Sequence, residues 1–186
     1  AQRGAHRELA LPSGRAHQTY SAAAFFQTTA YGMSSPAGLG FSPDGRSLLI
    51  WNDASGVINA YALSIEGGAA VPLTASTTNA TFAVSYFPGD ERVLVSADQG
   101  GNELNHLYVR ERDGAVRDLT PGENLKAAFL AWRRDGAKFW VTSNERNPQV
   151  FDLYEYDAAN YERRRIFENP GMEVADISRD AHWLAL

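Results

Sequence analysis

A repeat of about 45 residues constrains the fold of this chain more than any other feature of its sequence. The same pattern, an aromatic or apolar residue followed by a polar turn and a short apolar strand, begins at Phe41, Tyr86, Trp132 and Ile177, with spacings of 45, 46 and 45 residues. A strand-rich period of this length is typical of β-propeller blades, each of which is a four-stranded sheet. The sequence therefore predicts an all-β fold, a partial β-propeller of about three four-stranded blades with pieces of flanking blades.

Four short strand patterns, separated by Gly, Asp and Asn turns, recur in each period. They predict an amino-terminal segment with strand residues of an incomplete blade, including a strand within Ala22–Thr29, and then three complete blades and the truncated start of a further one. The expected boundaries are 1–36 for the amino-terminal segment, 37–81, 82–126 and 127–173 for the blades, and 174–186 for the truncated blade.

The turn Ser42–Gly45 illustrates the local chemistry of the repeat. It separates an expected first strand at 38–41 from a second strand at 46–51. A tight link between antiparallel strands needs positive φ, which Gly45 tolerates, and Asp44 can hydrogen-bond the amides of the turn. The recurrent turn aspartates are therefore interpreted as structural rather than catalytic.

Composition excludes several kinds of partner. The chain has 17 basic and 22 acidic residues, a net charge of −5, and no basic run longer than Arg163–Arg165, so neither nucleic acid nor an anionic membrane surface is expected. No apolar stretch approaches the roughly 20 residues of a membrane-spanning helix. The sequence has no cysteine, which excludes disulfides and thiolate zinc sites. Its acidic residues do not have the spacing of a calcium loop, and we expect no metal and no cofactor.

The ends of the chain predict further structure around it. Propellers close with about four to eight blades, and an open arc leaves apolar blade faces uncovered. We expect the missing blades to come from continuation of the polypeptide after Leu186, which the strand beginning at Trp183 favours, or from self-association through open blade edges. The chain begins with Ala1, as a mature exported chain or a trimmed one would, so we expect a periplasmic or secreted location and leave a cytoplasmic one open.

Three stretches bear on the family of the chain: Phe41–Gly45, whose turn many propellers share, the more specific Asp98–Tyr108 followed by Leu119–Gly122, and Asn144–Arg146 followed by Phe151–Tyr154. In these stretches, and over most of residues 20–186, the chain resembles the amino-terminal β-propeller of bacterial prolyl oligopeptidase-family serine peptidases, a relative of TolB-like propellers. The resemblance implies a propeller that precedes an α/β-hydrolase domain and filters which peptides reach the active site.

The family's catalytic residues have no counterparts in this sequence. The hydrolase domain would contribute a nucleophile serine within Gly-x-Ser-x-Gly, followed by an acid and a histidine. The chain has no Gly-x-Ser-x-Gly motif, and its histidines are only His6, His17, His106 and His182. No catalytic residue is therefore expected here, and the triad is expected after Leu186. His106 has no second histidine or cysteine at metal-ligand spacing and is interpreted as structural.

Polar residues gather between the second and third expected strands of successive blades, in loops that emerge on one face of a propeller. Within them we expect five side chains to face a substrate or partner: Asp98, Asn102, Glu103, Glu145 and Arg146. The glutamates would present carboxylates, and the fork of Arg146 suits the carboxyl terminus of a peptide. The alternative interpretation is that these residues form turns and that Arg146 pairs with a nearby acid.

The repeat, the resemblance and the polar loops together leave two functions open. The leading hypothesis is the non-catalytic propeller portion of a prolyl oligopeptidase-like serine peptidase, which gates or positions oligopeptide substrates for a hydrolase domain outside this chain. The alternative is a TolB-like propeller that binds a protein or peptide partner without an enzymatic role. A third class, a propeller that hydrolyses metabolites, would need carboxylates or histidines converging on the central channel, which the turn aspartates do not supply.

Overall fold

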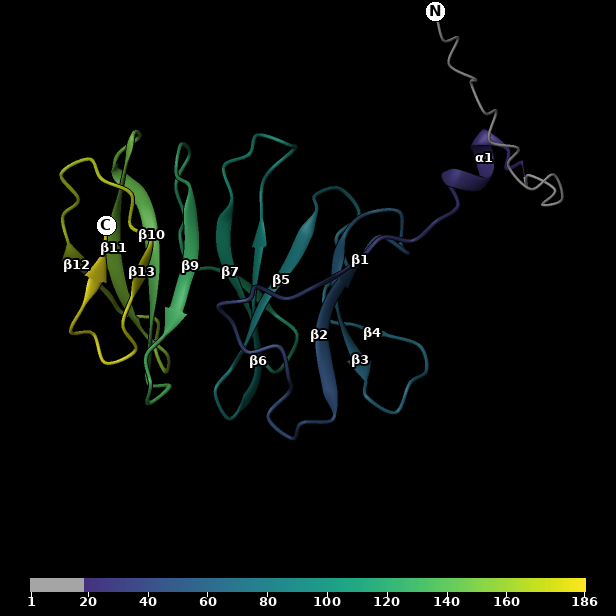
Figure 1. Cartoon of the computed structure of the whole chain (residues 1–186), viewed down its shortest axis with the longest axis horizontal. Coiled ribbons are helices and arrows are strands. Elements are labelled where there is room, and N and C mark those ends of the chain that lie inside the picture. The colour runs from purple at the N-terminus through teal and green to yellow at the C-terminus, as the bar shows by residue number, and fades with distance from the viewer. Residues whose placement is uncertain (1–18) are drawn as a thin grey trace, which may run out of the picture.

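A computed structural model of the protein describes residues 19–186, and nearly all of their regular structure is β-strand. Three four-stranded antiparallel sheets and one two-stranded sheet follow one another along the chain. The sheets stand side by side in a row, in the order in which they occur in the sequence (Figure 1). The predicted all-β partial propeller is confirmed.

Within each four-stranded sheet, strands that are neighbours in sequence are also neighbours in space. Each sheet is therefore a meander of hairpins between consecutive strands. The first sheet contains β1 (Tyr31–Met33), β2 (Ser47–Asn52), β3 (Asn59–Ser64) and β4 (Val71–Pro72). The second contains β5 (Thr81–Phe87), β6 (Asp90–Ala97), β7 (His106–Arg110) and β8 (Val116–Asp118). The third contains β9 (Ala127–Trp132), β10 (Lys138–Asn147), β11 (Val150–Asp157) and β12 (Arg163–Phe167).

The two ends of the described chain differ. A hairpin of β13 (Asp176–Ile177) and β14 (Leu184–Ala185) follows the third sheet, as expected for the start of a further blade. At the other end, the strand expected within Ala22–Thr29 is wrong, because α1 (Ala22–Phe25) forms a single helical turn there. Three alanines favour the helix, and the Ser21 side chain caps it by accepting a hydrogen bond from the Ala24 amide. The turn lies away from the sheets (Figure 1).

The first strand of the first sheet is interrupted. The continuous strand expected at 38–41 is wrong: β1 pairs with β2 earlier in the chain, and only the isolated bridges Leu39–Tyr86 and Phe41–Leu48 form later. The segment between them leaves the sheet and binds β5, where the Ser35 amide donates to the Val84 carbonyl. Gly38 permits this contact, because a Cβ atom there would lie 2.3 Å from the Val84 oxygen. The interruption therefore links the first and second sheets.

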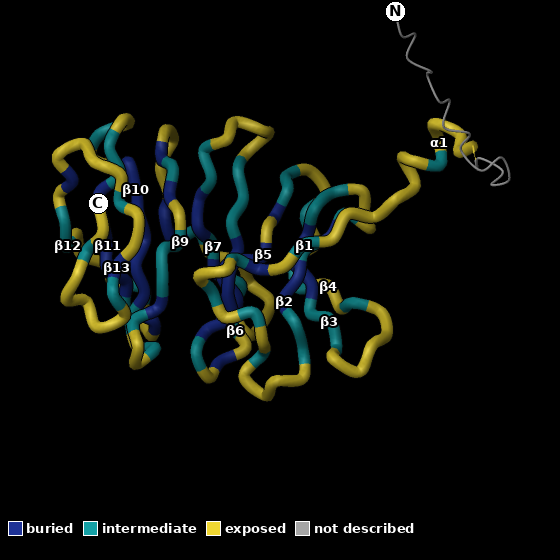
Figure 2. Tube along the Cα trace, in the orientation of Figure 1, coloured by how far each residue is buried: buried dark blue, intermediate teal, exposed yellow. Residues whose placement is uncertain are grey.

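Buried side chains lie mainly in the middle of the strands, whereas exposed residues gather at the two ends of the sheets and in α1 (Figure 2). The largest apolar cluster lies between the second and third sheets, where Phe87 packs edge-on against Trp132 at 5.0 Å between ring centres. Phe139 and Tyr156 extend the cluster as a stacked pair at 5.1 Å. Aromatic pairs of this kind add to the free energy gained by apolar burial.

The buried hydroxyl of Ser85 connects the second sheet to both of its neighbours. Ser85, which is fully buried in β5, accepts hydrogen bonds from the Trp132 indole Nε1 at 2.7 Å and from the Leu39 amide at 2.8 Å. Trp132 belongs to the third sheet and Leu39 to the interruption in the first, so one side chain of the second sheet contacts both neighbours. Without it, the buried Trp132 indole would have no acceptor, which is costly, and the Leu39 amide would lose its partner on β5.

Large apolar side chains are exposed at both ends of the row of sheets. On the first sheet and the segment that interrupts it they are Tyr31, Met33 and Phe41, and on the last hairpin the main one is Trp183, which is 78% exposed. Among residues 19–186, no helix has the length and apolar character needed to cross a membrane.

Replacing Ser85 with alanine should lower the free energy of unfolding by about 2 kcal/mol, because the Trp132 indole and the Leu39 amide would both lose their acceptor inside the protein. Urea titration followed by tryptophan fluorescence measures this change. Ser96→Ala is the matched control, since Ser96 lies on the adjacent strand β6 and its hydroxyl makes no hydrogen bond within residues 19–186. Equal losses in both variants would contradict the assignment.

Candidate functional site

The polar loops identified in the sequence lie at the same end of successive sheets. The β6–β7 loop binds the connection that enters the second sheet, where the Gly100 amide donates to Asn79 Oδ1 at 2.9 Å. It also binds the start of the third sheet, where the Ala127 amide donates to the Asn105 carbonyl at 2.8 Å. The β6–β7 loop is therefore in contact with both neighbouring connections on this end of the row, which we call the loop face.

Three of the predicted site residues shape the β6–β7 loop. Asp98 Oδ2 accepts a hydrogen bond from the Glu103 amide at 3.0 Å, and Asn102 Oδ1 accepts from the amides of Gln99 and Leu104. Asp and Asn commonly bond nearby backbone amides in this way. Glu103 adopts a φ of 60°, in the left-handed region, and its side chain is exposed. Asp98 and Asn102 thus fix the conformation that presents Glu103.

The structure places Glu145 and Arg146 in a strand, not in a loop as the sequence predicted. β10 continues to Asn147 and forms a long hairpin with β11, with an irregular register between Ser143 and Asn147. The polar composition of Asn144–Asn147 obscured this extension, because hydrophobic alternation is the main sequence indicator of a strand. Ion pairs with the neighbouring strand β11 and with β12 hold these polar side chains on the third sheet.

Arg146 is bound within the third sheet. Its Nε and Nη2 donate to the two carboxylate oxygens of Asp152 at 2.6 and 2.8 Å, and Nη2 also donates to the Asn169 carbonyl. Asp152 is fully buried, and its hydrogen bonds with Arg146 hold its pKa below the usual value. The alternative interpretation of Arg146, pairing with a nearby acid, describes this arrangement.

Glu145 is also paired, with Arg163 of β12, through two hydrogen bonds of 2.5 and 2.9 Å. The Arg163 guanidinium also lies over the rings of Tyr154 and Tyr156, which attract the cation. Of the five predicted residues, the structure brings Asp98, Asn102 and Glu103 together, and holds Glu145 and Arg146 in separate ion pairs on another sheet. Their role toward a substrate or partner stays a prediction.

Replacing Arg146 with glutamine should lower the free energy of unfolding by about 2 kcal/mol, because the buried Asp152 carboxylate would keep only Arg165 and the Asn169 amide as partners. Glu145→Gln is the matched control: it breaks a bidentate pair in which both side chains are partly exposed, and should cost less than about 1 kcal/mol. Chemical denaturation of the two variants measures both values. A larger loss in Glu145→Gln would contradict this ranking.

A pocket of about 400 Å³ opens between the first and second sheets at the loop face. Its walls combine apolar side chains, an aromatic ring, hydroxyls, amides and one carboxylate, that of Asp98. Burial raises the pKa of the Tyr108 phenol. A hydrogen bond with Gln99 lowers this pKa, but by less than burial raises it. The lining residues are Thr74, Ala75, Ser76, Asn79, Thr81, Val95, Ala97, Asp98, Gln99, Tyr108 and Val116. Sequence reasoning identified Asp98 but missed the rest, since they come from several strands of the second sheet and from the connection between β4 and β5.

His106 lies close to this pocket and has a partner that the sequence did not reveal. Its Nδ1 lies 2.7 Å from Asp118 Oδ2, and its ring stacks on Tyr108 with 6.1 Å between ring centres. The other Asp118 oxygen accepts the Thr120 amide. His106 and Asp118 meet through the register of β7 and β8, and this fixed pairing agrees with a structural role for the histidine.

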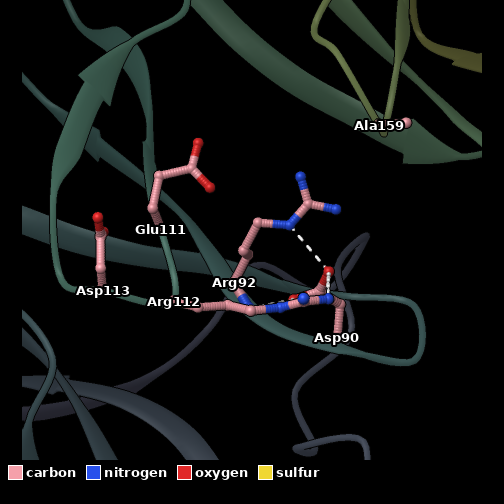
Figure 3. A pocket seen from close by; sticks show the side chains of 6 residues that line it. All are labelled: Asp90, Arg92, Glu111, Arg112, Asp113 and Ala159. Carbon is pink, nitrogen blue, oxygen red and sulfur yellow. Dashed lines mark hydrogen bonds and ion pairs between the residues drawn. The ribbon is translucent and has the colours of Figure 1, made fainter.

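A second pocket, of about 600 Å³, lies at the opposite end of the sheets and is highly charged (Figure 3). Arg92 and Arg112 converge on Asp90, which accepts hydrogen bonds from both guanidinium groups. Burial raises the pKa of Asp90, but the hydrogen bonds from Arg112 and Arg92 outweigh burial and hold it at about 2. Glu111 and Asp113 line the pocket near the arginines, and Ala159 lines it from the third sheet.

Arg92 connects this charged pocket to the third sheet. Its Nη1 donates to the Tyr161 hydroxyl at 2.6 Å and to the Ala158 carbonyl at 2.9 Å, and its guanidinium lies 4.2 Å from the centre of the Phe87 ring. The Tyr161 hydroxyl in turn donates to Glu111 at 2.8 Å. The arginines of the pocket are thus paired within the chain, so we interpret this site as a clamp between sheets.

The lowered pKa of Asp90 predicts a pH dependence of stability. A carboxyl whose folded pKa lies near 2, below its ordinary 3.8, adds stability that is complete above about pH 4 and lost as the pH falls through 2. Asp90→Asn should therefore be less stable than the wild type by about 2 kcal/mol at pH 6, and the gap should shrink toward pH 2. Urea titrations between about pH 6 and about pH 2.5 measure the gap. A gap that stays constant over this range would contradict the assignment.

Among residues 19–186, no group of three or more histidines and carboxylates is arranged to hold a metal ion. The described part of the loop face thus presents hydrogen-bonding and apolar groups together with the carboxylates of Asp98 and Glu103.

Comparisons with known proteins address the fold. No family model matches the sequence. TolB from Acinetobacter baumannii matches with a TM-score of 0.56 and 19% identity, over 77% of this chain and 35% of that one. Oligogalacturonate lyase from Vibrio parahaemolyticus matches with a TM-score of 0.55 and 20% identity, over 76% and 42% of the two chains. A prolyl endopeptidase matches with a TM-score of 0.57 and 16% identity, over 74% and 23%.

The chain has the fold of TolB-like propellers. It spans less than half the length of each of these structures, so the similarity covers some of their blades and not their whole architecture. The matched proteins carry names of different functions, as expected for a fold on which many functions are built. A TolB-like propeller therefore describes how these sheets are arranged, and function must be argued from the loop face.

Proposed function

We propose that this chain is the non-catalytic propeller portion of a prolyl oligopeptidase-like serine peptidase, in which the loop face gates or positions oligopeptides for an α/β-hydrolase domain. The observation that carries the proposal is the pocket of about 400 Å³ at the seam of the first two sheets, with Asp98 at its edge and Glu103 exposed on the same loop. A pocket of this size that combines apolar walls with hydrogen-bonding groups fits a short peptide segment.

The hydrogen-bonding groups of the pocket match what an extended peptide offers. Ser76, Asn79 and Gln99 provide hydroxyl and amide groups that both donate and accept, as each backbone unit of a peptide requires. The fold that the chain shares with a prolyl endopeptidase supports the proposal, because such a propeller is compatible with the architecture it requires. The catalytic residues belong to the proposed hydrolase domain.

The alternative function is a TolB-like propeller that binds a protein or peptide partner without hydrolysing it. The shared fold with TolB supports this alternative to the same degree. It uses the same loop face, because a segment of a folded partner makes the same kinds of contact as a free oligopeptide. A periplasmic or secreted location, and self-association through the exposed apolar side chains at the ends of the row, stay predictions under both functions.

The coding sequence that follows Leu186 separates the two functions. The peptidase proposal expects the remaining blades and then a Gly-x-Ser-x-Gly motif followed by an aspartate and a histidine, within about 450 residues. The full-length protein should then hydrolyse short peptides and leave folded proteins intact, measured by mass spectrometry of the products. Further repeats that run to a stop codon would contradict the peptidase proposal and favour the partner-binding propeller.

A further inference from the structure

The pocket at the seam of the first and second sheets has a distinct distribution of charge. Asp98 is the one charged residue among those that line it. The nearest basic side chain along β7 is Arg110, which does not line the pocket. Its Nε is held by the Leu73 carbonyl and its Nη1 by the Glu111 carbonyl. The pocket therefore presents a carboxylate, and no basic residue lines the pocket to neutralise it.

One hydrogen bond positions the Asp98 carboxylate and leaves other acceptor positions on its oxygens free. Its Oδ2 accepts the Glu103 amide at 3.0 Å, which fixes the rotation of the side chain. Within residues 19–186, no hydrogen bond or ion pair uses its Oδ1. An ionised carboxylate has about four acceptor positions, so the held side chain can take further donors from a ligand. In this respect Asp98 differs from Asp90 and Asp152, whose oxygens are bound by arginines.

The walls next to Asp98 suit the stem of a long side chain. Ala97 provides apolar surface, and the half-buried ring of Tyr108 lies near it on the adjacent strand. Lys and Arg side chains consist of an aliphatic stem with a charged head, so they bury the stem on apolar surface and direct the head to polar groups. An aromatic ring also attracts a cation placed over its face.

We propose that this pocket binds a lysine or arginine side chain of the peptide segment at the loop face, with the basic head on Asp98 and the aliphatic stem along Ala97 and Tyr108. The inference rests on the proposed binding of a peptide at this face and specifies which side chain the pocket selects. Asn79 and Gln99 supply amide oxygens that can accept from the remaining N–H donors of a guanidinium or ammonium group. An acidic side chain is disfavoured here, because it would face Asp98 with like charge.

The size of the pocket agrees with this occupant. A volume of about 400 Å³ lies near the lower end of the range for sites of small ligands, and accommodates one long side chain with its adjoining backbone. The chain also carries a net charge of −5, so a basic peptide approaches it with favourable long-range electrostatics.

Three capped peptides test the proposal: acetyl-Gly-Arg-Gly-amide, acetyl-Gly-Gln-Gly-amide and acetyl-Gly-Glu-Gly-amide. Each is titrated into the isotopically labelled chain of 186 residues at low ionic strength, and binding is followed by amide chemical shifts in the NMR spectrum. The arginine peptide should bind at least about tenfold more tightly than the glutamine peptide, since a hydrogen bond to a charged group contributes enough free energy for that ratio. The shifts should centre on Asn79, Gln99 and Val116.

Asp98→Asn should weaken binding of the arginine peptide about tenfold and leave the glutamine peptide unaffected. Asparagine keeps an oxygen that accepts the Glu103 amide, so the loop conformation is retained. Asp113→Asn is the matched control: Asp113 is also an aspartate that accepts one backbone amide, from Ala115, but it lines the pocket at the opposite end of the sheets. That variant should bind the arginine peptide like the wild type.

The possible results distinguish this inference from the proposed function on which it rests. If all three peptides shift the same loop-face amides with equal affinity, or if Asp98→Asn has no more effect than Asp113→Asn, the selection of a basic side chain is wrong and peptide binding at the loop face stands. Tighter binding of the glutamate peptide would also overturn it. If none of the peptides shifts any loop-face amide, both the inference and peptide binding at this face are wrong.

Discussion

The structure depends on the packing of one sheet against the next, and above all on the seam between the second and third sheets. A four-stranded sheet buries little on its own, so its stability comes from covering both of its faces. At this seam Phe87, Trp132 and Phe139 form an aromatic cluster, and the Trp132 indole is satisfied by the buried Ser85 hydroxyl. Arg92 closes one end of the seam through Tyr161 and the Ala158 carbonyl.

The same packing decides where function can be located. Bringing the sheets side by side places the connections of neighbouring sheets at common ends, so two surfaces of different chemistry result. At one end, Asp90, Arg92 and Arg112 neutralise one another in a clamp that stabilises the seam. At the loop face, Asp98 lines a pocket and has no cationic partner among the residues that line it. A paired charge is satisfied within the fold, whereas an unpaired one in a pocket is available to a ligand.

Sequence reasoning succeeded where local chemistry decides the structure. The strand predicted at 46–51 agrees with β2 (Ser47–Asn52) to within one residue at each end, because turn residues bound a short apolar segment on both sides. Sequence reasoning failed where contacts between strands decide the structure. The strand expected at 38–41 is interrupted by hydrogen bonds to β5, and polar residues such as Arg146 remain in β10 because Asp152 on the neighbouring strand pairs with them. The partner of Leu39 on β5 lies 46 residues away in the sequence, whereas Asp152 lies only six residues from Arg146 and reaches it through the pairing of β10 with β11.

The sequence by itself determined that the protein consists of repeated four-stranded sheets, because hydrophobic alternation and turn residues act over a few neighbouring positions and recur with a fixed period. It also singled out Asp98 as a polar residue on the loop face. Only the tertiary structure decided that Asp98 lines a pocket with Tyr108 and Asn79, and that Arg146 is bound by Asp152. Whether a charge is free or paired depends on sheet packing and strand register, which decide the side chains that meet.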